Sequence, residues 1–283
     1  MQNEKDVLDK LKNWANQNDC VRAMVLTSSR AHPDSHTDIF SDYDIELYVE
    51  DIQSFMNDDW MSFFSNPIIK WPLKPMSTFS EDWITRLVLF ENEVRIDFQI
   101  TSMKSVELSA YGNRGKVLVD KGGLTADLSE PTFSQYLTKK PTREEYASLV
   151  NAFFWDAPYI AKYLWRDELY FAKFMDNSLH FNNLLKMIEW YIAIKHNWSI
   201  NTGIQGRFFK RFLDSETWAE LEATFADANI ENNWDALFDL IDLFRKLAIH
   251  VGNKLGYTYP HETDRKITEY CKKIKATKHP SAL

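Results

Sequence analysis

The sequence predicts an α+β protein in which an N-terminal half containing strands and helices is followed by an all-helical C-terminal half. Two observations predict this division. Apolar residues recur at every second position in parts of the N-terminal half, which is typical of strands, and at every third or fourth position in the C-terminal half, which is typical of helices. A length of 283 residues exceeds the usual size of one domain. We therefore expect two domains, 1–140 and 141–283.

The N-terminal elements follow in order. Residues 4–17 carry apolar side chains at helical spacing and predict an amphipathic helix. The apolar run 21–26 predicts a buried strand that leads into a polar turn. Residues 42–49 alternate between polar and apolar, which predicts a strand with one apolar face. Residues 94–100 alternate in the same way, with 87–90 as the expected hairpin partner. From these residues alone, this half is α/β or α+β.

The C-terminal half begins with a helix-start signal. Thr142 and Glu145 form the T-x-x-E pattern of a capping box, so the domain boundary is placed just before them. Downstream, two long sets of apolar residues follow helical spacing: Leu184, Leu185, Ile188, Tyr191 and Ile192, and then Trp234, Leu237, Phe238, Ile241, Phe244, Leu247 and Val251. Such stripes predict a helical bundle.

Composition and charge exclude several classes of protein. The formal net charge is −8 and no Lys/Arg-rich cluster occurs, which disfavours nucleic acid as a partner. No apolar run approaches the roughly 20 residues that span a bilayer. The charged N-terminus lacks the features of a secretory signal, so we expect a cytoplasmic protein without a membrane partner. The two cysteines, Cys20 and Cys271, lie outside any metal-ligand spacing and are expected to be reduced thiols.

Three aspartates form the strongest candidate site. Asp42 and Asp44 lie on one face of a predicted strand, with Cα atoms about 6.6 Å apart, and can converge on Mg²⁺. An exposed polar face is the alternative for this pair alone. Asp97 lies on the non-core face of a second predicted strand and would complete a two-metal site. Three clustered carboxylates with no nearby fixed lysine would repel one another, so function explains them better than stability does.

A polar turn follows the first predicted strand. Ser28, Ser29 and Arg30 lie where a tight turn into a helix would direct backbone N–H groups, hydroxyls and a guanidinium at an anion. The alternative is an ordinary serine-rich helix cap. The aspartates downstream favour the anion site.

These features together resemble the nucleotidyltransferase superfamily and, within it, the aminoglycoside 6-adenylyltransferases, which modify streptomycin. The resemblance extends over nearly the whole chain and includes the segments 40–45, 95–98, 164–168 and 184–190. It implies a nucleotidyltransferase domain, built from a small mixed sheet with helices, followed by a helical substrate-binding domain. The α+β alternative is therefore preferred for the whole chain.

The resemblance also implies an activity, the Mg²⁺-dependent transfer of AMP from ATP to a hydroxyl of an aminoglycoside such as streptomycin, with release of pyrophosphate. Asp42 and Asp44 would bind both metal ions, while Asp97 would share one and orient or deprotonate the attacking hydroxyl. The remaining expected site residues would bind the nucleotide: Ser28, Ser29, Arg30, Lys186 and Lys195. The two lysines could equally be solvated side chains on amphipathic helices.

Three departures from the family pattern support a second hypothesis. Ser28 replaces a glycine of the phosphate turn, Ala152 replaces a glutamate, and Ile204 replaces a lysine. The chain could therefore be a weakened homologue that binds nucleotide or a small ligand without aminoglycoside turnover. A third hypothesis, transfer to a protein or an RNA end, is disfavoured because the sequence has no basic cluster.

Overall fold

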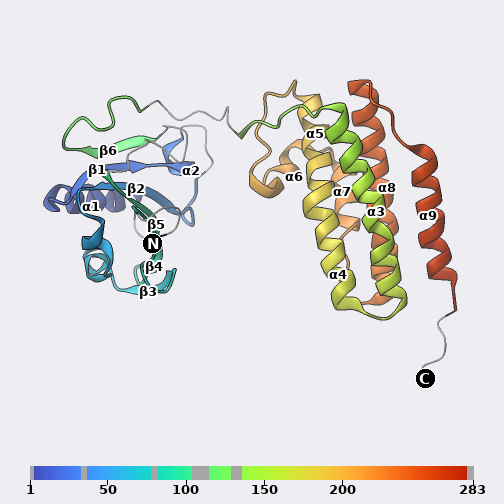
Figure 1. Ribbon diagram of the computed structural model, residues 1–283, viewed down its shortest axis with the longest axis horizontal. Helices are drawn as coiled ribbons and strands as arrows, with labels where there is room; N and C mark the ends of the chain where they lie inside the picture. The colour runs from blue at the N-terminus through green and yellow to red at the C-terminus, as the bar shows by residue number, and fades with distance from the viewer. Residues whose placement is uncertain (1–2, 33–36, 78–81, 104–114, 129–135, 279–283) are drawn as a thin grey trace. The chain divides into compact units, whose positions relative to one another are not determined.

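The computed structural model of the chain describes residues 3–32, 37–77, 82–103, 115–128 and 136–278. It divides into two compact units, Met1–Thr132 and Phe133–Leu283. The first contains a sheet and the second is helical, as Figure 1 shows, so the predicted α+β class is confirmed. The expected boundary between residues 140 and 141 stays a prediction, since compactness alone does not test whether either part folds separately.

The strands of the first unit form one mixed sheet in the order β3-β4-β5-β2-β1-β6. Their bounds are Val21–Leu26 (β1), Tyr43–Val49 (β2), Pro67–Trp71 (β3), Trp83–Phe90 (β4), Arg95–Ser102 (β5) and Lys116–Asp120 (β6). Among the pairs formed by these strands, β2 and β5 run parallel and the others are antiparallel. The expected hairpin is present as β4 and β5.

The larger apolar core of this unit lies on one face of the sheet. Helix α1, Glu4–Gln17, buries Leu11 and Trp14 against that face, where β2 contributes Ile45 and β5 contributes Phe98. Side chains alternate between the two faces of a strand, so residues next to these in sequence point the other way. The aspartates at positions 44 and 97 therefore lie on the face opposite this core.

Short helices occupy the connections of the sheet. The bounds are Ser28–Ala31 (α2), Ile52–Phe55 (η1) and Asp59–Phe63 (η2). Helix α2 follows β1 directly, so the predicted turn into a helix is present. The two 3₁₀ helices lie between β2 and β3 and complete the aromatic part of the core, where the ring of Trp60 packs 5.0 Å from that of Phe98.

The second unit is a bundle of helices that run side by side in Figure 1. Their bounds are Arg143–Trp165 (α3), Leu169–Ser178 (α4), the π-helix Leu179–Leu184, Leu185–Lys195 (α5), the 3₁₀ turn Ile204–Gly206, Phe209–Phe212 (α6), Ser215–Ala223 (α7), Ile230–Leu255 (α8) and His261–Ala276 (α9). The predicted capping box at the start of α3 is confirmed, since Thr142 and Glu145 exchange both hydrogen bonds. No helix within the described ranges is long and apolar enough to cross a membrane.

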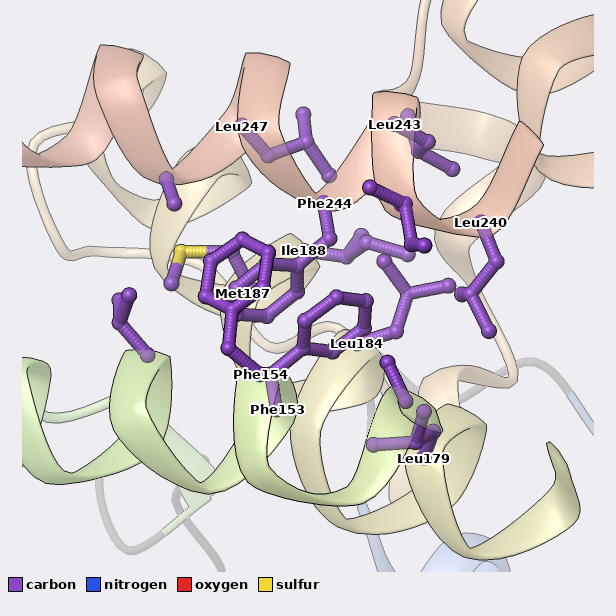
Figure 2. Close-up of a cluster of buried hydrophobic side chains, with 14 of the residues drawn as sticks. Phe153, Phe154, Leu179, Leu184, Met187, Ile188, Leu240, Leu243, Phe244 and Leu247 are labelled. Atoms are coloured by element: carbon purple, nitrogen blue, oxygen red, sulfur yellow. The ribbon is translucent and has the colours of Figure 1, made fainter. Parts of the chain in front are cut away.

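The core of the bundle joins α3, α5 and α8. Phe153 of α3 stacks on Phe244 of α8 with ring centroids 3.7 Å apart, and Met187 of α5 packs in the same cluster. Figure 2 shows these side chains pointing toward one another from the three helices. The stripes predicted for 184–192 and 234–251 supply most of this cluster, which confirms the helical bundle.

A buried ion pair fastens α9 to α8. Arg245 of α8 donates to both carboxylate oxygens of Asp264, which is 4% exposed at the start of α9. The hydroxyls of Tyr259 and Thr268 donate to the same carboxylate, at 2.9 and 3.0 Å. Because every partner is a donor, the carboxylate stays charged at neutral pH.

Candidate active site

The structure brings the three predicted aspartates together on the sheet. In the parallel pairing of β2 with β5, the Cα of Asp44 lies directly opposite that of Asp97. Asp42 lies one residue before β2 and two residues before Asp44. The side chains of these two aspartates therefore share a face of the sheet. The sequence alone predicted which face each side chain occupies, but it did not predict that the two strands are neighbours.

Crowding of these carboxylates changes their acidity. Burial, followed by the negative charges of Asp97 and Asp42, raises the pKa of Asp44 to about 6, against the hydrogen bond from Ser28 and the charge of Arg95. The pKa of Asp42 is raised mainly by burial, which outweighs its attraction to Arg95. A cation bound among the three carboxylates would remove this repulsion.

A residue that the sequence reasoning did not assign lies among the carboxylates. Arg95 donates from Nε and Nη2 to the two oxygens of Asp97, at 3.0 and 2.9 Å, and its Nε lies 3.5 Å from Asp42. The expectation from the sequence considered only lysine as a nearby fixed positive charge, and the structure places an arginine there. Arg95 stands two residues before Asp97, and this period-two spacing was the available signal.

Glu46 is a second polar residue on the same strand face that was not singled out. It is 6% exposed, and its Oε2 accepts a hydrogen bond of 2.7 Å from the hydroxyl of Tyr48. Its Oε1 has no hydrogen-bond partner among the described residues. Burial raises the pKa of Glu46, against the hydrogen bond from Tyr48. The polar face therefore continues one step beyond Asp44.

The turn between β1 and α2 is tied to β2 at Asp44. The backbone N–H of Thr27 donates to the carbonyl of Asp44 at 2.9 Å, and the hydroxyl of Ser28 donates to its carboxylate. Ser28 has φ of +54°, in the left-handed region that favours glycine. Ser29 follows in the first turn of α2. The departure from glycine at Ser28 thus places a side chain at a strained position beside a site carboxylate.

Arg30 holds the loop before β2. Its guanidinium donates to the carbonyls of Asp38, Ser41 and Asp42 and to the carboxylate of Glu4, with the side chain only 5% exposed. The guanidinium also lies 4.1 Å from the ring of Tyr43. These contacts tie Arg30 to the loop that carries Asp42. The expected contact of Arg30 with a phosphate stays a prediction.

A pocket of about 460 Å³ adjoins Asp42, one of the three aspartates, within the first unit. Asp42 and Arg95 line it on the side of the sheet, and Ile39 and Phe40 line it from the loop before β2. Both loop side chains are more than half exposed. The pocket thus offers space for a group that approaches the carboxylates from solvent.

The two predicted lysines lie on α5 of the helical unit, nine residues or about 14 Å apart along the axis. Lys186 pairs with Glu189 at 3.0 Å, and Lys195 pairs with Asp214 at 3.2 Å. Each lysine is at least one-third exposed, as solvated lysines are. The partner of Lys195 is about half exposed and that of Lys186 is 16% exposed. Contact of either lysine with a phosphate stays a prediction.

The donor chemistry of the carboxylate cluster fits a hard divalent cation, since Mg²⁺ prefers oxygen ligands and takes few carboxylates from the protein. In the part of the chain that the structure describes, no three Asp, Glu, His or Cys side chains converge closely enough to enclose an ion as they stand. Asp97 and Asp42 are oriented toward Arg95 instead. The residues therefore suit Mg²⁺ once this contact is exchanged.

Comparisons with known proteins find similarity to adenylyltransferases. The chain matches the family model described as streptomycin adenylyltransferase over residues 1–274. It is 32% identical to an aminoglycoside 6-adenylyltransferase from Bacillus subtilis (strain 168), covering 97% of this chain and 98% of the relative. A protein of the same name from Campylobacter jejuni is 30% identical, with 95% of each chain covered. The crystal structure of an aminoglycoside 6-adenyltransferase from Bacillus subtilis has 29% identity and a TM-score of 0.49, covering 98% of this chain and all of the other.

Proposed function

The chain belongs to the streptomycin adenylyltransferase family and is a nucleotidyltransferase, and from this premise we propose that it transfers AMP from ATP to a hydroxyl of an aminoglycoside such as streptomycin, releasing pyrophosphate. One structural observation carries the proposal. The register of β2 with β5 sets Asp44 opposite Asp97, with Asp42 directly before β2. Such a cluster of oxygen ligands on one sheet face suits nucleotidyl transfer.

The three aspartates have distinct proposed roles. Asp42 and Asp44 would bind two Mg²⁺ ions, and Asp97 would bind one of them. When bound, the ions supply charge neutralisation for the triphosphate and make the acceptor hydroxyl easier to deprotonate. A carboxylate oxygen of Asp97 would orient that hydroxyl and accept its proton as the oxygen attacks the α-phosphorus. Pyrophosphate then leaves.

Hydroxyl, amide and ammonium donors would hold the triphosphate. Ser28 and Ser29 offer hydroxyl and backbone N–H groups beside Asp44. Lys186 and Lys195 offer ammonium groups from α5. Arg30 contributes indirectly by fixing the loop that carries Asp42.

Charge supports a small cationic acceptor. Residues 1–140 carry a net charge of −7, and the remainder carries −1. An acidic surface attracts positively charged small molecules and repels nucleic acid. We therefore propose ATP and an aminoglycoside as substrates, a cytoplasmic location, and neither nucleic acid nor membrane as a partner.

The test is product formation by the full-length chain. The protein is incubated with ATP, Mg²⁺ and a panel of aminoglycosides that includes streptomycin, and the products are analysed by mass spectrometry. We expect one adenylyl group on the preferred acceptor and an equal amount of pyrophosphate, with no product from the Asp97→Asn variant or after chelation of Mg²⁺. Absence of product from every aminoglycoside would reject the proposed acceptor class.

The second candidate function is nucleotide binding without aminoglycoside turnover. It is favoured by the strained backbone at Ser28 and by the loss of the family's glutamate at Ala152 and of its lysine at Ile204. Ile204 is 80% exposed where the family pattern places a lysine. Calorimetry separates the two functions, since Mg-ATP binding without adenylylated product would identify a weakened homologue.

A further inference from the structure

We propose that Arg95 is a built-in competitor of the metal ion, so that the site binds a divalent cation together with a nucleotide in preference to the free ion. This inference rests on the proposed function, because it assumes that Asp42, Asp44 and Asp97 form a metal site. It assigns Arg95 the role of a positioning residue that acts through Asp97 and Asp42.

The contacts of Arg95 define the competition. Its guanidinium forms a two-pronged hydrogen bond to both oxygens of Asp97, at 3.0 and 2.9 Å, and lies 3.5 Å from Asp42. Fork-shaped arginine–carboxylate pairs are short, directional and charge-assisted. Mg²⁺ requires oxygens of the same carboxylates. A guanidinium and a divalent cation beside the same carboxylates would also repel each other, so Asp97 and Asp42 cannot bind both tightly at once.

Arg95 has space to leave. Its side chain is 46% exposed and lines the pocket of about 460 Å³ beside Asp42. The other arginine of this pocket, Arg30, is 5% exposed and engaged by backbone carbonyls, so it cannot move without disturbing the loop. Releasing Arg95 breaks two ion pairs whose guanidinium end is nearly half exposed, while the carboxylate of Asp97 is 14% exposed and that of Asp42 is 37% exposed.

The exchange is easier when phosphate arrives with the metal. A free divalent cation displaces the guanidinium of Arg95 into water, where the guanidinium finds no new anionic partner. An ion carried by a triphosphate brings several anionic oxygens into the same region, and a released guanidinium pairs well with phosphate. The competition therefore weakens binding of the free ion more than binding of the metal–nucleotide complex.

The experiment measures binding of Mn²⁺ to the full-length protein by calorimetry, first without nucleotide. We expect Arg95→Gln to bind Mn²⁺ about tenfold more tightly than the wild-type protein, which corresponds to about 1.4 kcal/mol. Arg95→Lys keeps the charge and loses the fork, so its affinity should lie between the two. The matched control is Arg22→Gln, which breaks an exposed arginine–glutamate pair with Glu50 on the same sheet and should change nothing.

A second measurement repeats the titration with an unreactive ATP analogue. The advantage of Arg95→Gln should disappear, because the displaced guanidinium of the wild-type protein then pairs with phosphate. A purely structural role for Arg95 would not produce this dependence on nucleotide.

The outcomes separate the two proposals. If the wild-type protein forms adenylylated product but Arg95→Gln binds Mn²⁺ no more tightly than the wild-type protein does, the competition is overturned and the proposed function stands. If Mn²⁺ binds to neither protein and no product forms, both are overturned. Equal tightening by Arg95→Gln with and without the analogue would also contradict the selective effect on the free ion.

Discussion

At the scale of single residues, Asp44 lies at the centre of the acidic cluster. Asp42 precedes it on the same face, and Asp97 lies opposite on the neighbouring strand. Its raised pKa reflects burial and two like charges, which the hydrogen bond from Ser28 only partly offsets. The charge of Asp44 therefore does not stabilise the fold and is available to a ligand.

The first prediction follows from this position. Asp44→Asn should abolish measurable Mg-ATP binding in calorimetry, because it removes a proposed metal ligand, and should change the free energy of unfolding by less than about 1 kcal/mol. Circular dichroism and urea unfolding check the fold. Asp42→Asn should behave in the same way, and unchanged Mg-ATP affinity in both variants would rule out the metal-site assignment.

The second prediction concerns the backbone of Ser28, whose φ is +54°. Ser28→Ala and Ser28→Gly both remove the hydroxyl that bonds to Asp44, but only glycine relieves the left-handed conformation. The glycine variant should therefore be more stable than the alanine variant by about 1 kcal/mol in urea unfolding. Equal stabilities would show that the turn relaxes when the side chain is shortened.

The sequence predicted the three aspartates because strand alternation fixes the face of each side chain. Arg95 follows the same alternation but was not assigned, because the sequence does not show which strands are neighbours or that Arg95 reaches Asp42 as well as Asp97. Arg30 was expected to contact phosphate. Its four partners on the loop and α1 depend on a loop conformation that no sequence pattern indicates.

At the scale of elements, the contact between α8 and α9 depends on one buried carboxylate. Burial alone would raise the pKa of Asp264, but hydrogen bonds from Arg245, Tyr259 and Thr268 outweigh it and lower the pKa below the usual value. Because the pKa is depressed in the folded state, the stability is fully present above the unfolded pKa of about 3.9. It is lost as the pH falls through the folded pKa.

The third prediction tests this pair. Asp264→Asn should lower the free energy of unfolding at pH 7 by about 3 kcal/mol, because it leaves Arg245 without its buried partner. The free energy of unfolding of the variant should also fall less than that of the wild-type protein as the pH is lowered below 5. The control is Asp235→Asn on α8, whose carboxylate is exposed and pairs with Lys275 on the surface, and which should have little effect. Parallel acid profiles for the wild type and Asp264→Asn would contradict the linkage.

The long elements followed from periodicity and the short ones did not. The helix at 4–17 and the strands at 21–26 and 43–49 match their predicted ranges closely. Strand β3 was missed because it begins with a proline and its apolar residues at 68 and 69 are both exposed, so they do not alternate. Strand β6 is a five-residue edge strand that only its pairing with β1 reveals.

At the scale of the whole molecule, each unit has its own apolar core. The cluster around Phe153 and Phe244 contains residues of the helical unit only, and the cluster around Leu11 and Phe98 contains residues of the sheet unit only. The resemblance read from the sequence is confirmed by the family match over residues 1–274.

The fourth prediction tests the domain boundary. A chain of residues 141–283 should fold by itself and unfold cooperatively on heating, because the bundle core needs no residue from the sheet unit. Far- and near-ultraviolet circular dichroism would follow both secondary structure and packing. Helical signal without a cooperative transition would mean that the bundle requires the first unit.

The pairing of β2 with β5 also disfavours a wrong strand register during folding. If β5 slipped by one residue, Arg95 and Asp97 would enter the apolar core while Ile96 and Phe98 turned toward water. Burying these charges is far less favourable than the correct alignment. The polar residues proposed for catalysis thus make misaligned strand pairings unfavourable. When the sheet forms in the correct register, the three carboxylates are brought together in the same step.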